Sequence, residues 1–273
     1  MATTTLFLDT SIQVSRKGHD DAEVAKIEGI IDKYDFISTS SYVRLEFKQS
    51  YIQDLVYLHK NLVKEKSFCR ALTITKDLNS HIGGRRKISS ILESLCKYFS
   101  SEKSFHSDDA FDKDLAYKIE LYLEGIIEKI WEWFEEKSVD HISDATECIR
   151  SKEPPRKKAL VFDARIKKCK SENIRCKLNE FFHKNEDEFK KIKEYIEGLK
   201  DPEKKKPEEL NRIASIIEEG IKNPNNLYDS KNCKGLGDAL VAVESKSFNE
   251  LFTKDVDQSK VICEAISLKS ILL

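Results

Sequence analysis

The chain begins with the stretch Leu6-Phe7-Leu8-Asp9-Thr10-Ser11, a short apolar run that ends in an acidic residue. Similar pairings of apolar and acidic residues return near the other end, in Gly237-Asp238-Ala239-Leu240-Val241-Ala242 and Leu251-Phe252-Thr253-Lys254-Asp255. A buried strand that ends in a carboxylate brings charge to the carboxyl edge of an open α/β sheet, where such folds bind their ligands. The two ends of the chain therefore predict one shared metal site.

The pattern around these stretches is typical of alternating strands and helices. Residues 4–9 are predicted to form a buried strand, and residues 22–31 a short helix. A second strand starts at Phe36 and enters Ser38-Thr39-Ser40-Ser41, whose hydroxyls are suited to capping the next helix. Glu46 lies about one turn into that helix, near the same sheet edge as Asp9. Near the C-terminus, the pattern predicts a strand at Phe252 and then a helix and a terminal strand.

The middle of the chain has a helical pattern. Apolar residues repeat there at intervals of three or four, as in Leu115, Ile119, Tyr122, Ile126, Ile130 and Trp133. Trp131 and Trp133 are predicted to lie in the core of this region. Because parallel strands need crossover connections and shared burial, we expect the two ends to fold together. The prediction is a three-layer α/β domain with a mostly parallel sheet, formed by residues 1–60 and 229–273, with a large all-α insertion at residues 61–228.

Composition limits the classes of function. The chain of 273 residues has 47 Lys and Arg against 48 Asp and Glu, so no overall positive field indicates nucleic-acid binding. Phosphate contacts would have to come from local groups, such as Arg16-Lys17 beside the predicted site, Arg85-Arg86-Lys87, Arg156-Lys157-Lys158 or Lys167-Lys168-Cys169-Lys170. No apolar run approaches the ~20 residues of a membrane span. We therefore expect a soluble protein. The seven cysteines form no CxxC pair, and such a scattered set is typical of reduced thiols in the cytoplasm.

Four pieces of the sequence together resemble the PIN-domain nucleases. They are Leu6-Phe7-Leu8-Asp9-Thr10-Ser11, then Ser40-Ser41-Tyr42-Val43-Arg44-Leu45-Glu46, then Gly237-Asp238-Ala239-Leu240-Val241-Ala242, and last Leu251-Phe252-Thr253-Lys254-Asp255-Val256-Asp257. Their order, residue types and neighbouring predicted elements agree with that family. The resemblance implies a PIN-like fold and metal-dependent hydrolysis of RNA, less often of DNA. It covers the two ends of the chain and none of the middle.

Carboxylates gather at one site only where a cation neutralises them, because like charges raise each other's pKa and repel. Oxygen ligands without His or Cys favour Mg²⁺ or Mn²⁺. The predicted catalytic residues and metal ligands are Asp9, Glu46, Asp238 and Asp255. Asp257 either joins these ligands or caps the final helix. Thr10 and Thr253 are predicted to hold a ligand or a bound water in position.

The resulting hypothesis is a cytoplasmic endoribonuclease, with a toxin or defence effector as the setting that the resemblance suggests. The insertion would restrict access, bind a structured RNA such as tRNA, or receive an inhibitor or partner protein. Two alternatives stay open: a non-catalytic PIN-like scaffold for protein interaction, and a nuclease directed at DNA. The sequence also leaves the oligomeric state open, a homo-oligomer included.

Overall fold

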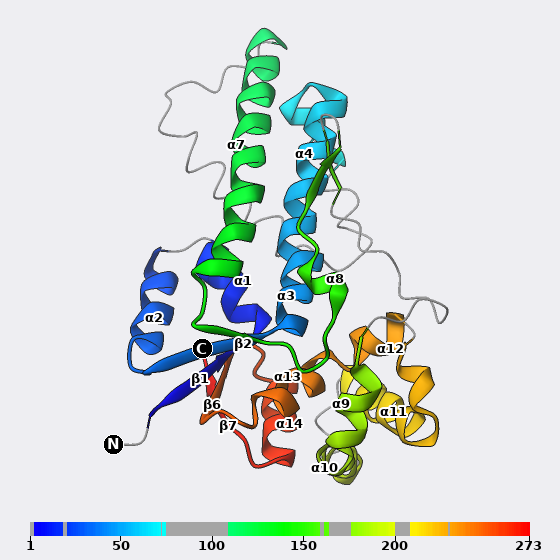
Figure 1. Ribbon diagram of the computed structural model, residues 1–273. Helices are drawn as coiled ribbons and strands as arrows, with labels where there is room; N and C mark the ends of the chain where they lie inside the picture. Colours follow the sequence, from blue (N-terminus) through cyan, green and yellow to red (C-terminus); the bar gives the residue numbers. More distant parts are fainter. Residues whose placement is uncertain are drawn as a thin grey trace.

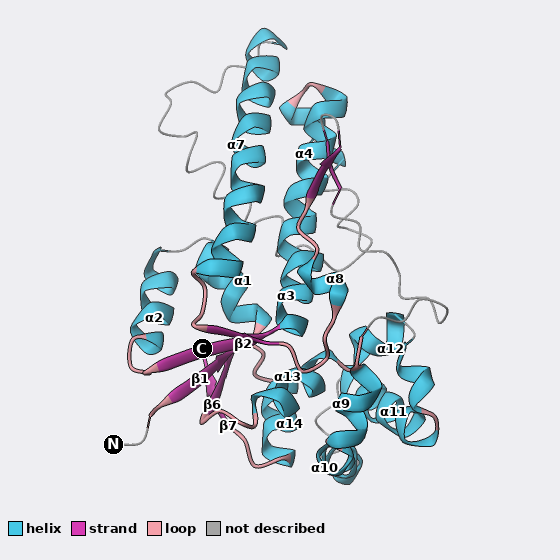
Figure 2. Cartoon of the chain, in the orientation of Figure 1, coloured by secondary structure: helices cyan, strands magenta, loops and turns pink. Residues whose placement is uncertain are grey.

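The computed structural model describes residues 3–18, 21–71, 73–74, 109–158, 161–163, 176–199, 208–228 and 230–273. A sheet of five parallel strands crosses its centre in the order β3-β2-β1-β6-β7 (Figures 1 and 2). The strands are β1 (Thr5–Leu8), β2 (Phe36–Ser40), β3 (His141–Ser143), β6 (Glu250–Thr253) and β7 (Lys269–Leu272). The predicted α/β class with a parallel sheet is confirmed, and strands from the two ends of the chain lie together.

The strand order reverses in the middle of the sheet. From β1 the chain moves outward to β2 and β3, and it later returns to the other side of β1 with β6 and β7. β1 and β6 are therefore neighbours, with Leu8 paired to Phe252 at their carboxyl ends. Open α/β sheets bind ligands in the crevice that forms at such a reversal.

Helices cover both faces of the sheet, because side chains of a strand alternate between its faces. On one face, Leu6 and Leu8 form a cluster with residues of α1 (Thr10–Gly18) and α2 (Asp21–Ile31). Phe7 instead joins the larger cluster, which includes residues of α13 (Gly237–Ser245) and α14 (Gln258–Ala265). The side chains of Leu6, Phe7 and Leu8 are fully buried. Burial of each stabilises the fold by roughly 1.5–3 kcal/mol. The result is a three-layer arrangement.

A nearly continuous helical run leads away from the sheet, and Glu46 lies in its first part, close to the sheet edge. α3 (Ser41–Phe47) starts at Ser40, whose hydroxyl accepts the backbone N–H of Val43 at 3.1 Å. This confirms the predicted capping role of the serine and threonine cluster. The run continues through a π-helical segment, η1 (Lys48–Ile52), into α4 (Gln53–Glu65). Short π segments inside helices are frequent at functional sites, and this one begins two residues after Glu46.

α4 and α7 (Asp109–Glu136) run side by side away from the sheet (Figure 1) and are called here the helical arm. The base of the arm packs on α3, where the Phe47 ring lies 4.8 Å from the ring of Phe134 and 6.4 Å from that of Trp133. Trp131 is 8% exposed, and Trp133 packs against the main core cluster. The predicted amphipathic helix and the core position of its tryptophans are confirmed.

The predicted all-α character of the insertion is wrong. Residues 141–143 supply β3, which pairs with β2 and completes one edge of the main sheet. β4 (Arg156–Lys158) and β5 (Val161–Asp163) form a separate antiparallel pair. Strands of three residues show too little alternation for a sequence pattern to detect. α4 also runs across the predicted boundary at residue 61, while residue 229 lies outside the described residues.

The remaining helices form a second group beside α13 and α14. Its members are α9 (Leu178–Lys184), α10 (Glu186–Gly198), α11 (Glu208–Lys222), the 3-10 helix η3 (Pro224–Tyr228) and α12 (Ser230–Gly235). The short helix α8 (Ile149–Lys152) packs on α3 instead. The rings of Phe182 and Phe189 stack at 4.5 Å inside it. Among the described helices, none has both the length and the apolar character that crossing a membrane requires. No disulfide forms among the five cysteines in the described residues.

Candidate active site

Asp9 lies between β1 and α1, at the point where the sheet order reverses. Its side chain is 8% exposed. Asp9 Oδ2 accepts hydrogen bonds from Thr253 Oγ1 at 2.8 Å and Ser11 Oγ at 2.9 Å, and Oδ1 accepts the Thr10 N–H at 2.6 Å. Burial raises the pKa of the Asp9 carboxyl above its usual range, although these hydrogen bonds oppose the shift. The chain therefore fixes this carboxylate firmly in a dry position.

Thr10 and Thr253 connect the acidic residues to one another. Thr253 is the last residue of β6, and its hydroxyl both donates to Asp9 and accepts the Asp255 N–H at 3.0 Å. Thr10 donates its hydroxyl to Glu46 Oε2 at 2.6 Å. Each threonine thus positions at least one carboxylate of the predicted set. This is the arrangement expected of side chains that orient metal ligands.

The other oxygen of Glu46 faces the start of α13. A Cβ atom placed on Gly237 would lie 2.8 Å from Glu46 Oε1 and 2.8 Å from the Tyr42 hydroxyl. Glu46 therefore reaches from α3 to both the end of β1 and the residue beside Asp238. Sequence analysis did not identify Gly237 as a site residue. A glycine directly before a predicted ligand at a helix start was the available signal, but only the close approach of α3 gives it meaning.

Asp238 is the second residue of α13 and is partly buried. Burial, followed by the carboxylates of Asp9, Asp255 and Glu209, raises its pKa to about 7. In the described residues, no Lys or Arg forms an ion pair with Asp9, Asp238 or Asp255. A proton or a cation is therefore the natural partner of this carboxylate near neutral pH.

Asp255 lies at the carboxyl end of β6, two residues beyond Thr253. Its Oδ1 accepts the Gln258 N–H at 3.1 Å, so it caps the start of α14. Asp257 is exposed and makes no capping hydrogen bond with its side chain. The predicted capping role of Asp257 is therefore wrong, because the turn at the end of β6 brings Asp255 to that N–H instead.

The structure brings Asp9, Glu46, Asp238 and Asp255 to one edge of the sheet, but not into a closed set of ligands. Among the described residues, no three of these acids have oxygens that all lie within 4.8 Å of one another. Carboxylates repel at short range, and hydrogen bonds hold the oxygens of Asp9 and Glu46 where they are. All the donors are carboxylate oxygens, which fits Mg²⁺ or Mn²⁺ and does not favour a softer metal.

The predicted nucleic-acid contacts differ from each other in the fold. Arg16 forms an ion pair with Glu28 at 2.8 Å, and its side chain is 9% exposed. Its guanidinium also donates to the carbonyl of Ser138. Both of these contacts of the guanidinium are therefore within the protein. Lys17 Nζ lies 4.0 Å from the centre of the Trp133 ring and is only partly buried. The basic runs at residues 85–87 and 167–170 lie outside the described residues.

Replacing Gly237 by Ala is expected to displace the Glu46 carboxylate. The added methyl group needs space that Glu46 Oε1 and the Tyr42 hydroxyl occupy, and Tyr42 is held by a 3.0 Å hydrogen bond to the carbonyl of Cys233. Overpacking of this kind costs about 1–3 kcal/mol. Urea unfolding should show a loss of about 1 kcal/mol or more, and titration with Mn²⁺ should show weaker binding.

Gly125→Ala is the matched control, because a Cβ atom there meets nothing within 4 Å in the interior of α7. That variant should be stabilised by up to about 1 kcal/mol and should bind Mn²⁺ as the wild type does. If Gly237→Ala behaves in the same way as Gly125→Ala, the close approach of Glu46 and Gly237 has no energetic importance.

No protein-family model matches this sequence, and comparisons with curated proteins and with solved structures found no match either. The functional argument therefore depends on the geometry and chemistry of the site.

Proposed function

We propose that this chain is a metal-dependent endoribonuclease of the PIN type, with Asp9, Glu46, Asp238 and Asp255 as its catalytic carboxylates. The observation that carries the proposal is the convergence of these acids at the carboxyl edge of the sheet. They come from the ends of two neighbouring strands and from two helices that are distant in the sequence. Their position at the reversal of strand order is where an α/β sheet binds its ligand.

The chain's own residues prepare this edge for a divalent cation. Asp9 and Asp238 are the acids whose pKa values are raised, which indicates that negative charge there lacks compensation. The hydroxyls of Thr253 and Thr10 hold Asp9 and Glu46. When bound, Mg²⁺ or Mn²⁺ would polarise a phosphodiester and lower the pKa of a water molecule. Asp257, exposed beside Asp255, is the candidate for an outer ligand of the same ion.

RNA is the substrate we propose, by the resemblance of the four sequence pieces to PIN nucleases. Lys17, next to the site on α1, is the described basic residue best placed to contact a phosphate, since Arg16 is engaged by Glu28. The helical arm would contact a structured RNA such as tRNA, or an inhibitor or partner protein. A toxin or defence effector in the cytoplasm, active as a monomer or a homo-oligomer, is the corresponding biological hypothesis.

One observation favours a non-catalytic scaffold as the second candidate. The acids do not bring three oxygens within 4.8 Å of one another in the described residues, whereas ligands of one Mg²⁺ at about 2.1 Å from the ion lie within about 4 Å of each other. If no cation draws them together, the edge of the sheet is only an acidic surface. A nuclease acting on DNA uses the same carboxylates and differs only in substrate.

Cleavage of matched RNA and DNA oligonucleotides with Mn²⁺ or Mg²⁺ tests these hypotheses. We expect the wild type to cut RNA in preference to DNA and to lose activity with a chelator. Asp9→Asn should cut at least ~100-fold more slowly, because it weakens the binding of the cation that would stabilise the charge of the transition state. Asp32→Asn, at an exposed position before β2 and so at the opposite edge of the sheet, is the control and should stay within about threefold.

Three results would contradict the proposal. Equal cleavage by Asp9→Asn and the wild type would assign the activity to a contaminant. Preference for DNA would support the alternative substrate. Intact RNA and DNA, with structured and unstructured substrates both tried and Mn²⁺ binding verified, would support the scaffold.

A further inference from the structure

His59 is a buried histidine in the helical arm, far from the acidic edge of the sheet. Its side chain is fully buried, and neither of its ring nitrogens has a hydrogen-bond partner. Nε2 lies 3.3 Å from Glu124 Oε1, close enough for attraction but without the alignment of a hydrogen bond. Leaving a buried polar atom unpaired costs about 1–3 kcal/mol. This arrangement therefore requires an explanation.

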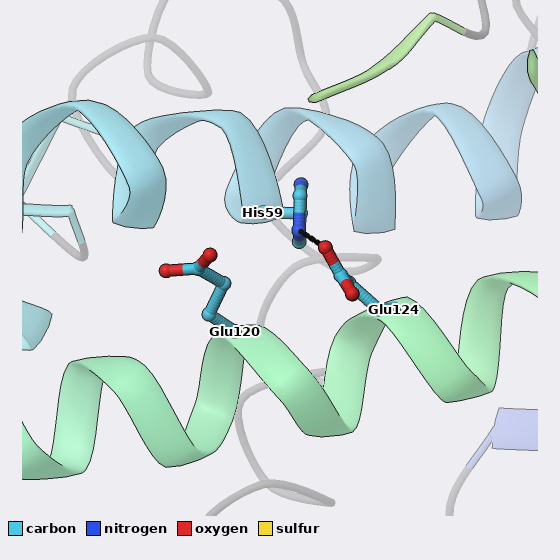
Figure 3. A group of neighbouring side chains, drawn as sticks. All are labelled: His59, Glu120 and Glu124. Carbon is cyan, nitrogen blue, oxygen red and sulfur yellow. Dashed lines mark ion pairs between the residues drawn. The ribbon is translucent and has the colours of Figure 1, made fainter. Parts of the chain in front are cut away.

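Two carboxylates face this histidine from the other helix of the arm. Figure 3 shows His59 on α4 opposite Glu120 and Glu124, which lie one turn apart on α7. One ligand atom from each of the three residues lies within 4.8 Å of the other two. Ligands about 2.1 Å from a bound ion lie up to about 4 Å apart. Closing that difference requires movement of a side chain, and Glu120, which is partly exposed, is able to move.

We propose that His59, Glu120 and Glu124 form a second metal site, which takes a divalent transition-metal ion such as Zn²⁺ between α4 and α7. One imidazole and two carboxylates suit Zn²⁺ better than Mg²⁺, which prefers oxygen ligands alone. Water would occupy a fourth position.

Lys157 competes with an ion at this site. Its Nζ lies 2.8 Å from Glu124 Oε1, the same oxygen that faces His59. The Lys157 side chain is 39% exposed, so it can turn toward solvent when an ion arrives. Without an ion, Lys157 neutralises Glu124, and neither ring nitrogen of His59 forms a hydrogen bond.

The second ion would be structural. Along the helical run from Glu46 to His59, a rise of about 1.5 Å per residue gives a separation of roughly 20 Å. Two metal ions that share one catalytic step lie about 4 Å apart, so this site does not complete the acidic one. It would join α4 to α7 and stiffen the arm. The inference does not depend on the proposed nuclease activity.

The test is Zn²⁺ binding by tag-free, full-length protein carrying Asp9→Asn and Asp238→Asn, which weaken the acidic site. Equilibrium dialysis should show one Zn²⁺ per chain. Adding Glu120→Gln should lower the affinity at least ~10-fold, while Glu128→Gln, at an exposed position of the same helix, should leave it unchanged. Replacing Lys157 by Met should raise the affinity, because it removes the competing cation.

A second measurement separates loss of binding from loss of fold. Zn²⁺ should raise the melting temperature of the background protein and of Glu128→Gln, since it binds only the folded chain, but not that of Glu120→Gln. Equal binding by Glu120→Gln and Glu128→Gln would overturn the proposal. So would the absence of Zn²⁺ binding in the Lys157→Met variant, where nothing competes for Glu124.

Discussion

Asp238→Asn is expected to abolish cleavage and, at the same time, to stabilise the metal-free protein. The carboxylate is surrounded by other acids and partly buried, and its pKa is raised to about 7. Removing a metal ligand from the site should cost at least ~10³-fold in rate, or about 4 kcal/mol of transition-state stabilisation. Removing a charge that the folded chain disfavours should increase the free energy of unfolding.

The stabilisation should depend on pH in a defined direction. The pKa of Asp238 is higher in the folded protein, at about 7, than its usual value of 3.8. A group of this kind stabilises the folded state fully at low pH, and the contribution is lost as the pH rises from about 4 to about 7. The uncharged amide of the Asp238→Asn variant would carry no such dependence, so the advantage of the variant should be about 2 kcal/mol larger at pH 8 than at pH 5.

Urea unfolding of chelator-treated wild type and Asp238→Asn at both pH values measures this difference. Asp257→Asn, at an exposed position, serves as the control and should follow the wild type at each pH. A difference between Asp238→Asn and wild type that does not change with pH would show that Asp238 is not under electrostatic strain. Loss of cleavage together with loss of stability would indicate a structural role instead of a catalytic one.

Phe47→Ala should destabilise the protein by about 3–5 kcal/mol, the largest stability change that we expect from one substitution. The ring is fully buried where α3 meets the base of the helical arm. It lies 5.6 Å from the Tyr51 ring and 4.8 Å from the Phe134 ring. Truncation leaves a cavity that these rigid neighbours cannot fill, and it loosens the helix that carries Glu46.

Chemical denaturation measures the effect, and Mn²⁺ binding at low denaturant shows whether Glu46 has also moved. Tyr117→Ala is the control, because this aromatic residue of α7 is 58% exposed and its truncation should cost no more than ~0.5 kcal/mol. If Phe47→Ala costs less than about 1 kcal/mol, the arm is not anchored through α3.

Local sequence patterns were sufficient for the elements near the site. The apolar run before Asp9 predicted β1, and the serine and threonine cluster predicted the cap at Ser40, because strand alternation and capping depend on adjacent residues. α1 was missed, since Ile12 and Val14 are its only apolar residues and their spacing of two does not indicate a helix. β3 was missed because three residues are too few to show the two-residue alternation that identifies a strand.

The contacts of the site's side chains could not be predicted from local sequence, because they form between segments that are distant in the chain. Arg16 was expected to contact nucleic acid, but its ion pair with Glu28 forms only when α1 and α2 pack together. The absence of a side chain at Gly237 is important only because Glu46 and Tyr42 approach it from another helix. The sequence left open whether Asp257 is a ligand or the cap of α14, and the turn after β6 brings Asp255 to that N–H instead.

The sequence by itself determined that the chain has strand-end acids at both termini and a mainly helical middle. These features follow from composition and from periods of two to four residues, which are local properties. Only the tertiary structure decided that β1 and β6 are neighbours, so that Asp9 and Asp255 share one edge. Burial, and then the charges of these two acids, raise the pKa of Asp238 there. It also placed His59 opposite Glu120 and Glu124. Proximity between distant segments depends on packing of the whole chain, and electrostatic coupling depends on that proximity.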